Sequence, residues 1–420
     1  ALSSNTTGTS NIGLGYGAGA NITTGSNNTI IGTYGGTTTL ANTVVIAAGG
    51  TERLKIDASG IQVNGSALAL GVGEYIGNSI AISSDDTALA NDDGTNNNNI
   101  GMGHDAANSV TTGYDNIAIG RDAAKNATTA LYNIGIGYGA LLGDVTSKLT
   151  GNYNTGLGSY SGNGLTTGSY NALSGYYAGA NISTGTFNSA FGPFALQGNS
   201  TSKLTGSYNV GMGYEAGNNL TTGQYNVLNG YKAGYNLSTG NYNVLSGPEA
   251  GKGITTASNS IAIGRKSLGL GVTTGTDNVA IGQNTGYEIT SGEHNVIMGS
   301  YSGAALTTGS ENVFLGRGAG GHAVTGTGNT FTGYYAGYAV AGTADNNTMV
   351  GKSAGSGKTS GSNNTLIGYY SLASSPTVSN EITLGSTAVT SLRCQVTSIT
   401  ALSDQRDKAN ITPLTAGLSF

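Results

Sequence analysis

The chain has little of what most metal centres and disulfide-stabilised domains are built from. Its 420 residues include one cysteine, three histidines, four prolines and no tryptophan. The lone Cys394 excludes an internal disulfide framework. The three histidines (His104, His294 and His322) are isolated, and no Cys/His cluster of zinc-site spacing exists. We therefore expect no metal site and no cofactor.

Charge and long apolar runs are also scarce. Charged residues make up 9% of the chain, against about a quarter in typical soluble domains. The net charge of −5 gives no basic footprint for nucleic acid. No apolar stretch is long enough to span a membrane, and no signal peptide is visible after Ala1. We expect neither nucleic-acid binding nor membrane insertion.

Glycine is abundant, with 73 residues, and it recurs in phase. Residues 226–240 (NVLNGYKAGYNLSTG) show one unit, in which a short run from Asn to Gly precedes Tyr-x-Ala-Gly and an aliphatic residue. The Gly that closes this run, here called the anchor, recurs at Gly103, Gly120, Gly137, Gly158, Gly175, Gly192, Gly213, Gly230, Gly247, Gly264, Gly282, Gly299, Gly316, Gly333, Gly351, Gly368 and Gly385. Twelve of the sixteen intervals are 17 residues, two are 18 and two are 21. A fixed period of this kind indicates a repeat architecture.

Each repeat unit is expected to form one coil of a parallel β-solenoid, or β-roll. Several glycines per unit exclude helices, since each costs roughly 1 kcal/mol in a helix interior. The run Asn278–Gly282 alternates as a strand does. The residue three after the anchor is almost always small, which predicts close packing, and the aliphatic residue seven after it is expected in the core. The two 21-residue units carry the same insertion, 146–151 and 201–206, which indicates an outward loop.

Asparagine recurs at one position of the unit and predicts a ladder. The positions are Asn116, Asn133, Asn154, Asn171, Asn188, Asn209, Asn226, Asn243, Asn278, Asn295, Asn312, Asn329, Asn347 and Asn364. In stacked coils such amides hydrogen-bond to one another. We favour this structural role over ligand binding.

An aromatic residue precedes the ladder Asn in one part of the repeat. The positions are Tyr153, Tyr170, Phe187, Tyr208, Tyr225 and Tyr242. Such a file could stack on sugar rings, so the five tyrosines are candidate glycan-binding residues. The alternative is a ladder that packs on itself, because aromatic pairs gain roughly 0.5–1.5 kcal/mol.

Four coils carry their bulky strand residue one position early, on the opposite strand face. These residues are Leu173, Leu228, Leu245 and Phe331. We expect them to bury against a neighbouring chain.

The domain organisation expected from the sequence has four parts. Residues 1–39 hold N-terminal solenoid coils, and 40–98 hold a β-hairpin insertion (a strand and turn over 51–60, paired with 61–65) and a polar loop. The loop carries Asp85, Asp86, Asp92 and Asp93, which favour a solvated loop over a cation site. Residues 99–390 form the main solenoid shaft. Residues 391–420 form a neck and the start of a C-terminal domain.

Two resemblances then appear. The runs 116–120 (NIAIG) and 278–282 (NVAIG) resemble the repeat of trimeric autotransporter adhesin heads, which implies a β-roll and a parallel homotrimer. Residues 401–411 (ALSDQRDKANI) resemble the junction where phage tail fibres and spikes meet an endosialidase-type intramolecular chaperone. That resemblance implies self-cleavage of the Leu402–Ser403 bond, with Ser403 as nucleophile and Lys408 as general base.

The resemblances imply a structural and host-attachment protein: the trimeric shaft or tip of a phage tail fibre, located on the virion. Its partners would be a host cell-surface glycan or protein receptor and other tail or baseplate proteins. One alternative is a bacterial trimeric adhesin head. Another is a tailspike glycan depolymerase, which needs two carboxylates roughly 5–9.5 Å apart; Asp277 and Glu293 are its best candidate pair. Apart from self-cleavage we expect no enzyme activity.

Overall fold

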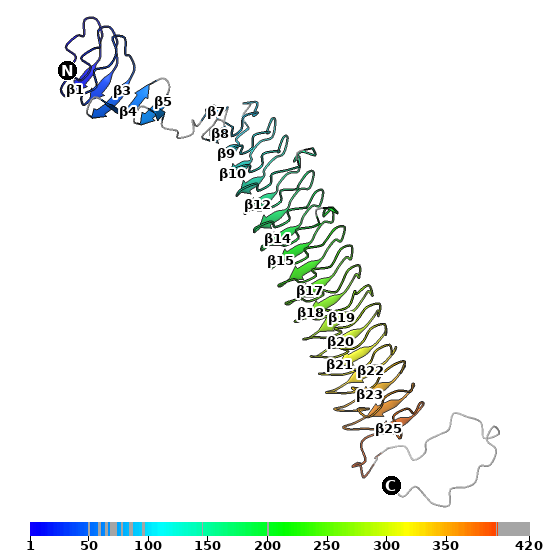
Figure 1. Cartoon of the computed structure of the whole chain (residues 1–420). Helices are drawn as coiled ribbons and strands as arrows, with labels where there is room; N and C mark the ends of the chain where they lie inside the picture. Colours follow the sequence, from blue (N-terminus) through cyan, green and yellow to red (C-terminus); the bar gives the residue numbers. More distant parts are fainter. Residues whose placement is uncertain are drawn as a thin grey trace, which may run out of the picture. The chain divides into compact units, whose positions relative to one another are not determined.

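The computed structural model describes residues 1–48, 51–57, 60–63, 66–67, 74–76, 79–83, 87–94, 97–144, 146–199, 201–391 and 393. This described part consists of strands and turns (Figure 1), and it contains no helix that could cross a membrane. The chain divides into two compact units, Ala1–Tyr177 and Ala178–Phe420. The all-β, parallel-solenoid class predicted from the sequence is confirmed.

The first unit contains two sheets. The strands of the first sheet follow the chain: β1 (Ile12–Leu14), β2 (Thr29–Ile31), β3 (Val44–Ala48), β4 (Thr51–Asp57), β5 (Gly60–Val63) and β6 (Ser66–Ala67). Strands β1 to β3 pair in parallel, and β3 to β6 pair antiparallel. The pairing of β4 with β5 confirms the predicted hairpin.

The second sheet of this unit begins the main solenoid. Its strands are β7 (Glu74–Ile76), β8 (Ser79–Ile82), β9 (Ile100–Met102), β10 (Ile117–Ile119), β11 (Ile134–Ile136), β12 (Thr155–Leu157) and β13 (Ala172–Ser174). Strand β7 pairs antiparallel with β8. From β8 onward each strand pairs in parallel with the next.

The second unit repeats this parallel pattern throughout. Its strands are β14 (Ser189–Phe191), β15 (Val210–Met212), β16 (Val227–Asn229), β17 (Val244–Ser246), β18 (Ile261–Ile263), β19 (Val279–Ile281), β20 (Val296–Met298), β21 (Val313–Leu315), β22 (Thr330–Thr332), β23 (Thr348–Val350), β24 (Thr365–Ile367) and β25 (Ile382–Leu384). Each strand pairs in parallel with the next, one per coil (Figure 1).

Strand register is independent of coil length. Ile117 lies opposite Ile134, one 17-residue unit away, and Ile134 lies opposite Thr155 across a 21-residue unit. The extra residues leave the coil as a loop: Thr146 is exposed, whereas Leu149 is buried and bridges back to the preceding coil. The predicted outward loop is confirmed.

The anchor glycines are required by both backbone conformation and space. From Gly103 to Gly368 their φ angles lie between +119° and +138°, a region that residues with a Cβ rarely adopt. A Cβ on Gly230 would also lie 2.6 Å from the carbonyl oxygen of Gly247 in the next coil. Within each of the two compact units the anchors form one file, and consecutive coils approach closely along it.

Three positions of each coil supply the core. The small residue three after the anchor and the aliphatic residue seven after it are buried, as Ala233 and Leu237 show. The third position is the middle residue of the strand, such as Ala280, whereas its flanking residues Val279 and Ile281 point outward and are half-buried. The core is thus one side chain wide on the strand side.

This orientation corrects the prediction for Leu173, Leu228, Leu245 and Phe331. All four are at most 1% exposed within their own chain, so no neighbouring chain is needed to bury them. The reason is that the middle strand position faces the core in every coil. A large residue there packs over a glycine four residues after an anchor: a Cβ on Gly337 would lie 2.6 Å from the Phe331 ring.

The reverse exchange occurs where the middle strand residue is glycine. Leu196 then fills the space, and its Cγ lies 2.7 Å from the Cβ position of Gly211. A large side chain is thus found either at the middle strand position or at the position four after the anchor. The total volume of the core stays similar, as close packing requires.

The predicted asparagine ladder is confirmed. Asn226 is fully buried, and its Oδ1 accepts hydrogen bonds from the backbone N–H and the Nδ2 of Asn243, both at 3.0 Å. Its own Nδ2 donates to Oδ1 of Asn209 at 3.0 Å and to the carbonyl of Gly240 at 2.9 Å. Each asparagine therefore ties three coils together.

One core position carries a charge that sequence reasoning missed. Lys358, seven residues after anchor Gly351, is 1% exposed, where the other coils bury mostly Leu or Ile. Its Nζ donates to the carbonyl of Val378. Burial lowers the pKa of Lys358 below its ordinary value, because an apolar surrounding disfavours the charged amine.

Removing one ladder amide is expected to destabilise the protein strongly. Asn226→Ala leaves buried donors and acceptors of three coils without partners, at a cost of roughly 3 kcal/mol. The melting temperature is measured by circular dichroism. The exposed Asn236→Ala serves as the control, and an unchanged melt of Asn226→Ala would contradict the role of the ladder.

Ser260→Asn is expected to raise the melting temperature in the same measurement. Ser260 occupies a ladder position, but its hydroxyl accepts only a 3.4 Å hydrogen bond from the N–H of Asn278.

Lys358→Leu is expected to stabilise the protein by about 1–2 kcal/mol at neutral pH, because it removes a buried charge. The Val378 carbonyl keeps a bond from Asn364 Nδ2 at 3.0 Å. Since the folded pKa lies below 10.5, the unfolded chain binds more protons just below pH 10.5, and wild-type stability rises with pH there. The advantage of the variant should shrink in the same range. Denaturant titrations across pH, with exposed Lys352→Leu as control, test this; a destabilised variant would contradict it.

Candidate functional site

The aromatic file occupies an unfavourable backbone position. Tyr153, Tyr170 and Tyr225 have φ angles of +58° to +60°, in the left-handed region where a residue with a Cβ is strained by about 1 kcal/mol or more. In other coils this position holds residues that tolerate the conformation, such as Asn98, Asp277 or Gly328. The aromatic residues must therefore recover the strain through another interaction.

Ring stacking supplies that interaction. In the first unit Tyr153 lies between Tyr132 and Tyr170, with ring centroids 4.8 Å away on both sides and interplanar angles of 9° and 10°. In the second unit the stacked pairs are Phe187–Tyr208, Tyr208–Tyr225 and Tyr225–Tyr242, at 4.8–4.9 Å and within 7° of parallel. The spacing of the rings matches the separation of neighbouring strands.

This geometry decides what the file presents to solvent. Inside a stack such as that of Tyr208, Tyr225 and Tyr242, neighbouring rings cover the faces, while the edges and hydroxyls remain exposed. The file offers a row of hydrogen-bonding hydroxyls rather than a row of open stacking platforms. Tyr132 belongs to the file but was missed in the sequence, although it precedes ladder residue Asn133 as the other aromatics precede theirs.

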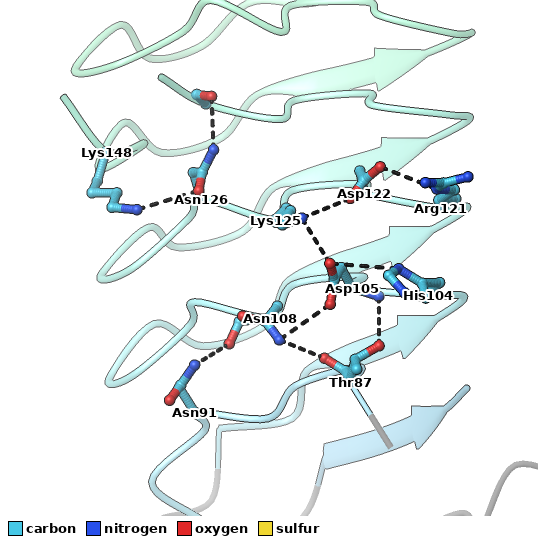
Figure 2. A network of polar contacts seen from close by, with 11 residues as sticks. Thr87, Asn91, His104, Asp105, Asn108, Arg121, Asp122, Lys125, Asn126 and Lys148 are labelled. Carbon is cyan, nitrogen blue, oxygen red and sulfur yellow. Dashed lines mark hydrogen bonds and ion pairs between the residues drawn. The ribbon is translucent and has the colours of Figure 1, made fainter. Parts of the chain in front are cut away.

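A cluster of charged side chains lies on the first unit (Figure 2). His104 Nδ1 is 3.5 Å from a carboxylate oxygen of Asp105, and Arg121 Nε is 3.4 Å from Asp122. The Asp105 backbone N–H donates to the Thr87 hydroxyl at 2.8 Å. His104, Asp105 and Asp122 come close enough to share an ion.

Lys125 already neutralises this cluster. Its Nζ lies 2.7 Å from Asp105 and 3.0 Å from Asp122, between the two carboxylates (Figure 2). Hydrogen bonding to Lys125 lowers the pKa of Asp105, and the hydrogen bonds to both carboxylates raise the pKa of Lys125. The ammonium stands where a cation would be held, so this cluster links coils rather than forming a metal centre.

Two other groups of acidic residues have structural partners. Asp92 accepts hydrogen bonds from Ser79 Oγ at 2.9 Å and from Nδ2 of Asn99 at 3.1 Å; Asn99 extends the ladder, because its Oδ1 accepts from Asn116 Nδ2 at 3.0 Å. Asp92 therefore caps the ladder, whereas Asp85 and Asp86 lie outside the described residues. Asp277 accepts a bond from Thr276 Oγ1 at 2.7 Å and lies 4.0 Å from His294.

The predicted self-cleavage site cannot be placed. Ser403 and Lys408, together with Leu402 and Cys394, lie outside the described residues. Their assignment stays a prediction from the sequence motif. The glycan-binding role of the tyrosines stays a prediction as well. The structure shows that their rings form a stacked file.

Comparison with known proteins adds no family to this description. No protein-family model matches the chain. No curated protein and no solved structure matches it either. The chain itself shows a parallel β-solenoid with an asparagine ladder and a stacked aromatic file.

Proposed function

We propose that this chain is the shaft or tip of a phage tail fibre, a parallel homotrimer that attaches the virion to host-surface glycans or to a protein receptor. The repeat architecture supports a structural protein, and the motif around Ser403 supports the phage assignment. Other tail or baseplate proteins would hold the fibre. The observation that carries the proposal in the structure is the outer face of the solenoid strands.

That face is apolar in coil after coil. In each three-residue strand the two flanking side chains point away from the core, and many of them are apolar. Ile263, Met298 and Ile367 are each about 40% exposed, and Ile136 and Leu157 repeat the pattern in the first unit. Contiguous exposed apolar surface of this kind marks interaction sites. Here it supports self-assembly, since a parallel copy would bring an identical file into contact in register.

The remaining surface supports attachment to a polar partner. Charged groups are few, and the aromatic file exposes tyrosine edges and hydroxyls. Tyrosine combines an apolar ring with a hydrogen-bonding tip and contributes contact area at little entropic cost. A sugar-coated cell surface is a suitable partner for such groups. That the assembly contains three chains is inferred from the resemblance to trimeric adhesin heads.

Charge on the outer strand face is expected to break the assembly. The wild-type protein should have three times the monomer mass of 41.7 kDa in size-exclusion chromatography with light scattering. Ile263→Asp combined with Met298→Asp should give monomers with an unchanged circular dichroism spectrum, because both side chains lie outside the core. Thr222→Asp, in an exposed turn, is the control. A stable wild-type monomer would contradict the proposal.

The full-length product is expected to cut itself at Leu402–Ser403. A serine hydroxyl is a poor nucleophile until a base removes its proton, and the amine of Lys408 can serve if its pKa is lowered. The gene is expressed with its natural C-terminus as wild type, Ser403→Ala and Lys408→Ala, and the products are compared by mass spectrometry. Only the wild type should release a C-terminal fragment. Release from Ser403→Ala would show that another residue is the nucleophile.

A further inference from the structure

A hollow of about 420 Å³ opens on the second unit. Four tyrosines line it, Tyr287, Tyr301, Tyr335 and Tyr338, and they come from three of four successive coils. This volume lies within the range of small-molecule sites, which are typically lined by aromatic side chains and a few polar groups. The stacked aromatic file described above is a separate feature, at the residue before the ladder asparagine.

The hollow lies beside a coil that has glycine at two positions where neighbouring coils have tyrosine. Two residues after the anchor this coil has Gly318, where the coils before and after have Tyr301 and Tyr335. Five residues after the anchor it has Gly321, and the next coil has Tyr338 there. A Cβ on Gly321 would lie 2.8 Å from Cε2 of Tyr338. The rings of Tyr335 and Tyr338 thus lie over the two glycines, in the space that side chains there would need.

The rings around this space do not form a parallel stack. Tyr335 and Tyr338 have centroids 4.6 Å apart at an interplanar angle of 64°, and His322 meets Tyr338 at 81°. Tyr301 is 45% exposed, and it contacts no other aromatic ring in the described part of the chain. Unlike the rings inside the stacked file, the Tyr301 ring therefore has no other described ring packed against it.

Two opposite charges complete the lining. Arg317 and Glu288 are both exposed side chains of the hollow, and neither forms an ion pair among the described residues. Arg317 Nη1 donates to the Tyr334 hydroxyl at 3.3 Å, and its guanidinium carbon lies 5.8 Å from the centroid of the Tyr335 ring. A guanidinium donates several hydrogen bonds in one plane, and a carboxylate accepts several. Their formal charges cancel.

We propose that this hollow binds one neutral saccharide ring of a glycan. A sugar has an apolar C–H face, which suits the uncovered face of Tyr301, and a rim of hydroxyls, which both donate and accept. Arg317 would donate to adjacent hydroxyls and Glu288 would accept from others. Arg317 disfavours a cationic ligand, and Glu288 disfavours a phosphate. The inference rests on the proposed attachment function and assigns it a place on the chain.

The experiment compares the wild type with two variants of the hollow. Ala305→Leu fills it from a half-buried lining position, and Arg317→Ala removes its guanidinium. Arg265→Ala is the matched control, because Arg265 is the same exposed residue directly after an anchor in another coil. Circular dichroism melts establish that all variants fold. Binding is measured by saturation-transfer NMR and titration with neutral oligosaccharides of glucose, galactose, mannose and N-acetylglucosamine, and with choline and inorganic phosphate.

The wild type and Arg265→Ala should bind at least one neutral oligosaccharide with equal affinity. Arg317→Ala and Ala305→Leu should bind it at least tenfold more weakly. Equal binding by all four proteins, preference for choline or phosphate, or no saccharide binding by the wild type would each overturn the inference. The mass of the assembly is measured on the same samples. A trimer without hollow-dependent binding refutes only the saccharide site, whereas a sugar-binding monomer refutes only the proposed fibre assembly.

Discussion

The close stacking of coils is the constraint on which the rest of the structure depends. Hydrogen bonds between parallel strands hold consecutive coils a few ångströms apart, and the anchor glycines permit that approach by lacking a Cβ. The asparagine ladder converts the same approach into buried hydrogen bonds: an amide such as that of Asn226 serves its own coil and both neighbours. Each coil is individually too small to bury a core. Its stability comes largely from its neighbours, as in other repeat proteins.

The narrowness of the core explains two further features. With one strand side chain facing inward per coil, volume has to be balanced between facing positions, as Leu196 over Gly211 and Phe331 over Gly337 illustrate. The two residues on either side of the inward-facing strand residue point outward, because strand side chains alternate between the two faces. The outer face is apolar because many of these flanking residues are apolar, and it is the surface on which the proposed assembly rests.

The sequence predicted the features that follow from the repeat period, but not which face of each strand points into the core. The phase of Gly103 to Gly385 was sufficient for the coil, the strand, the loop insertion and the asparagine ladder, because each follows from a residue type at a fixed interval. It was not sufficient for the inward face, because a strand alternates without saying which side is the core. Leu173 and Phe331 were therefore assigned to a neighbour. The burial of Lys358 was not predicted, because a residue type that occurs once at its repeat position gives no periodic signal. The hollow beside Arg317 was not predicted for a related reason: it lies beside Gly318 and Gly321, and glycine carries little signal in a chain where it is common.

The two loops of the 21-residue coils have a consequence for how this surface can change. Leu149 and Leu204 return the chain to register after each loop, whereas Thr146, Ser147, Thr201 and Ser202 before them are exposed and lie outside the core. Lengthening a flexible loop costs little, about 0.6 kcal/mol for each doubling. A lineage under pressure to present new surfaces could therefore change these two segments with little loss of stability, and a protein engineer could graft a foreign peptide into either loop without shifting the strand register.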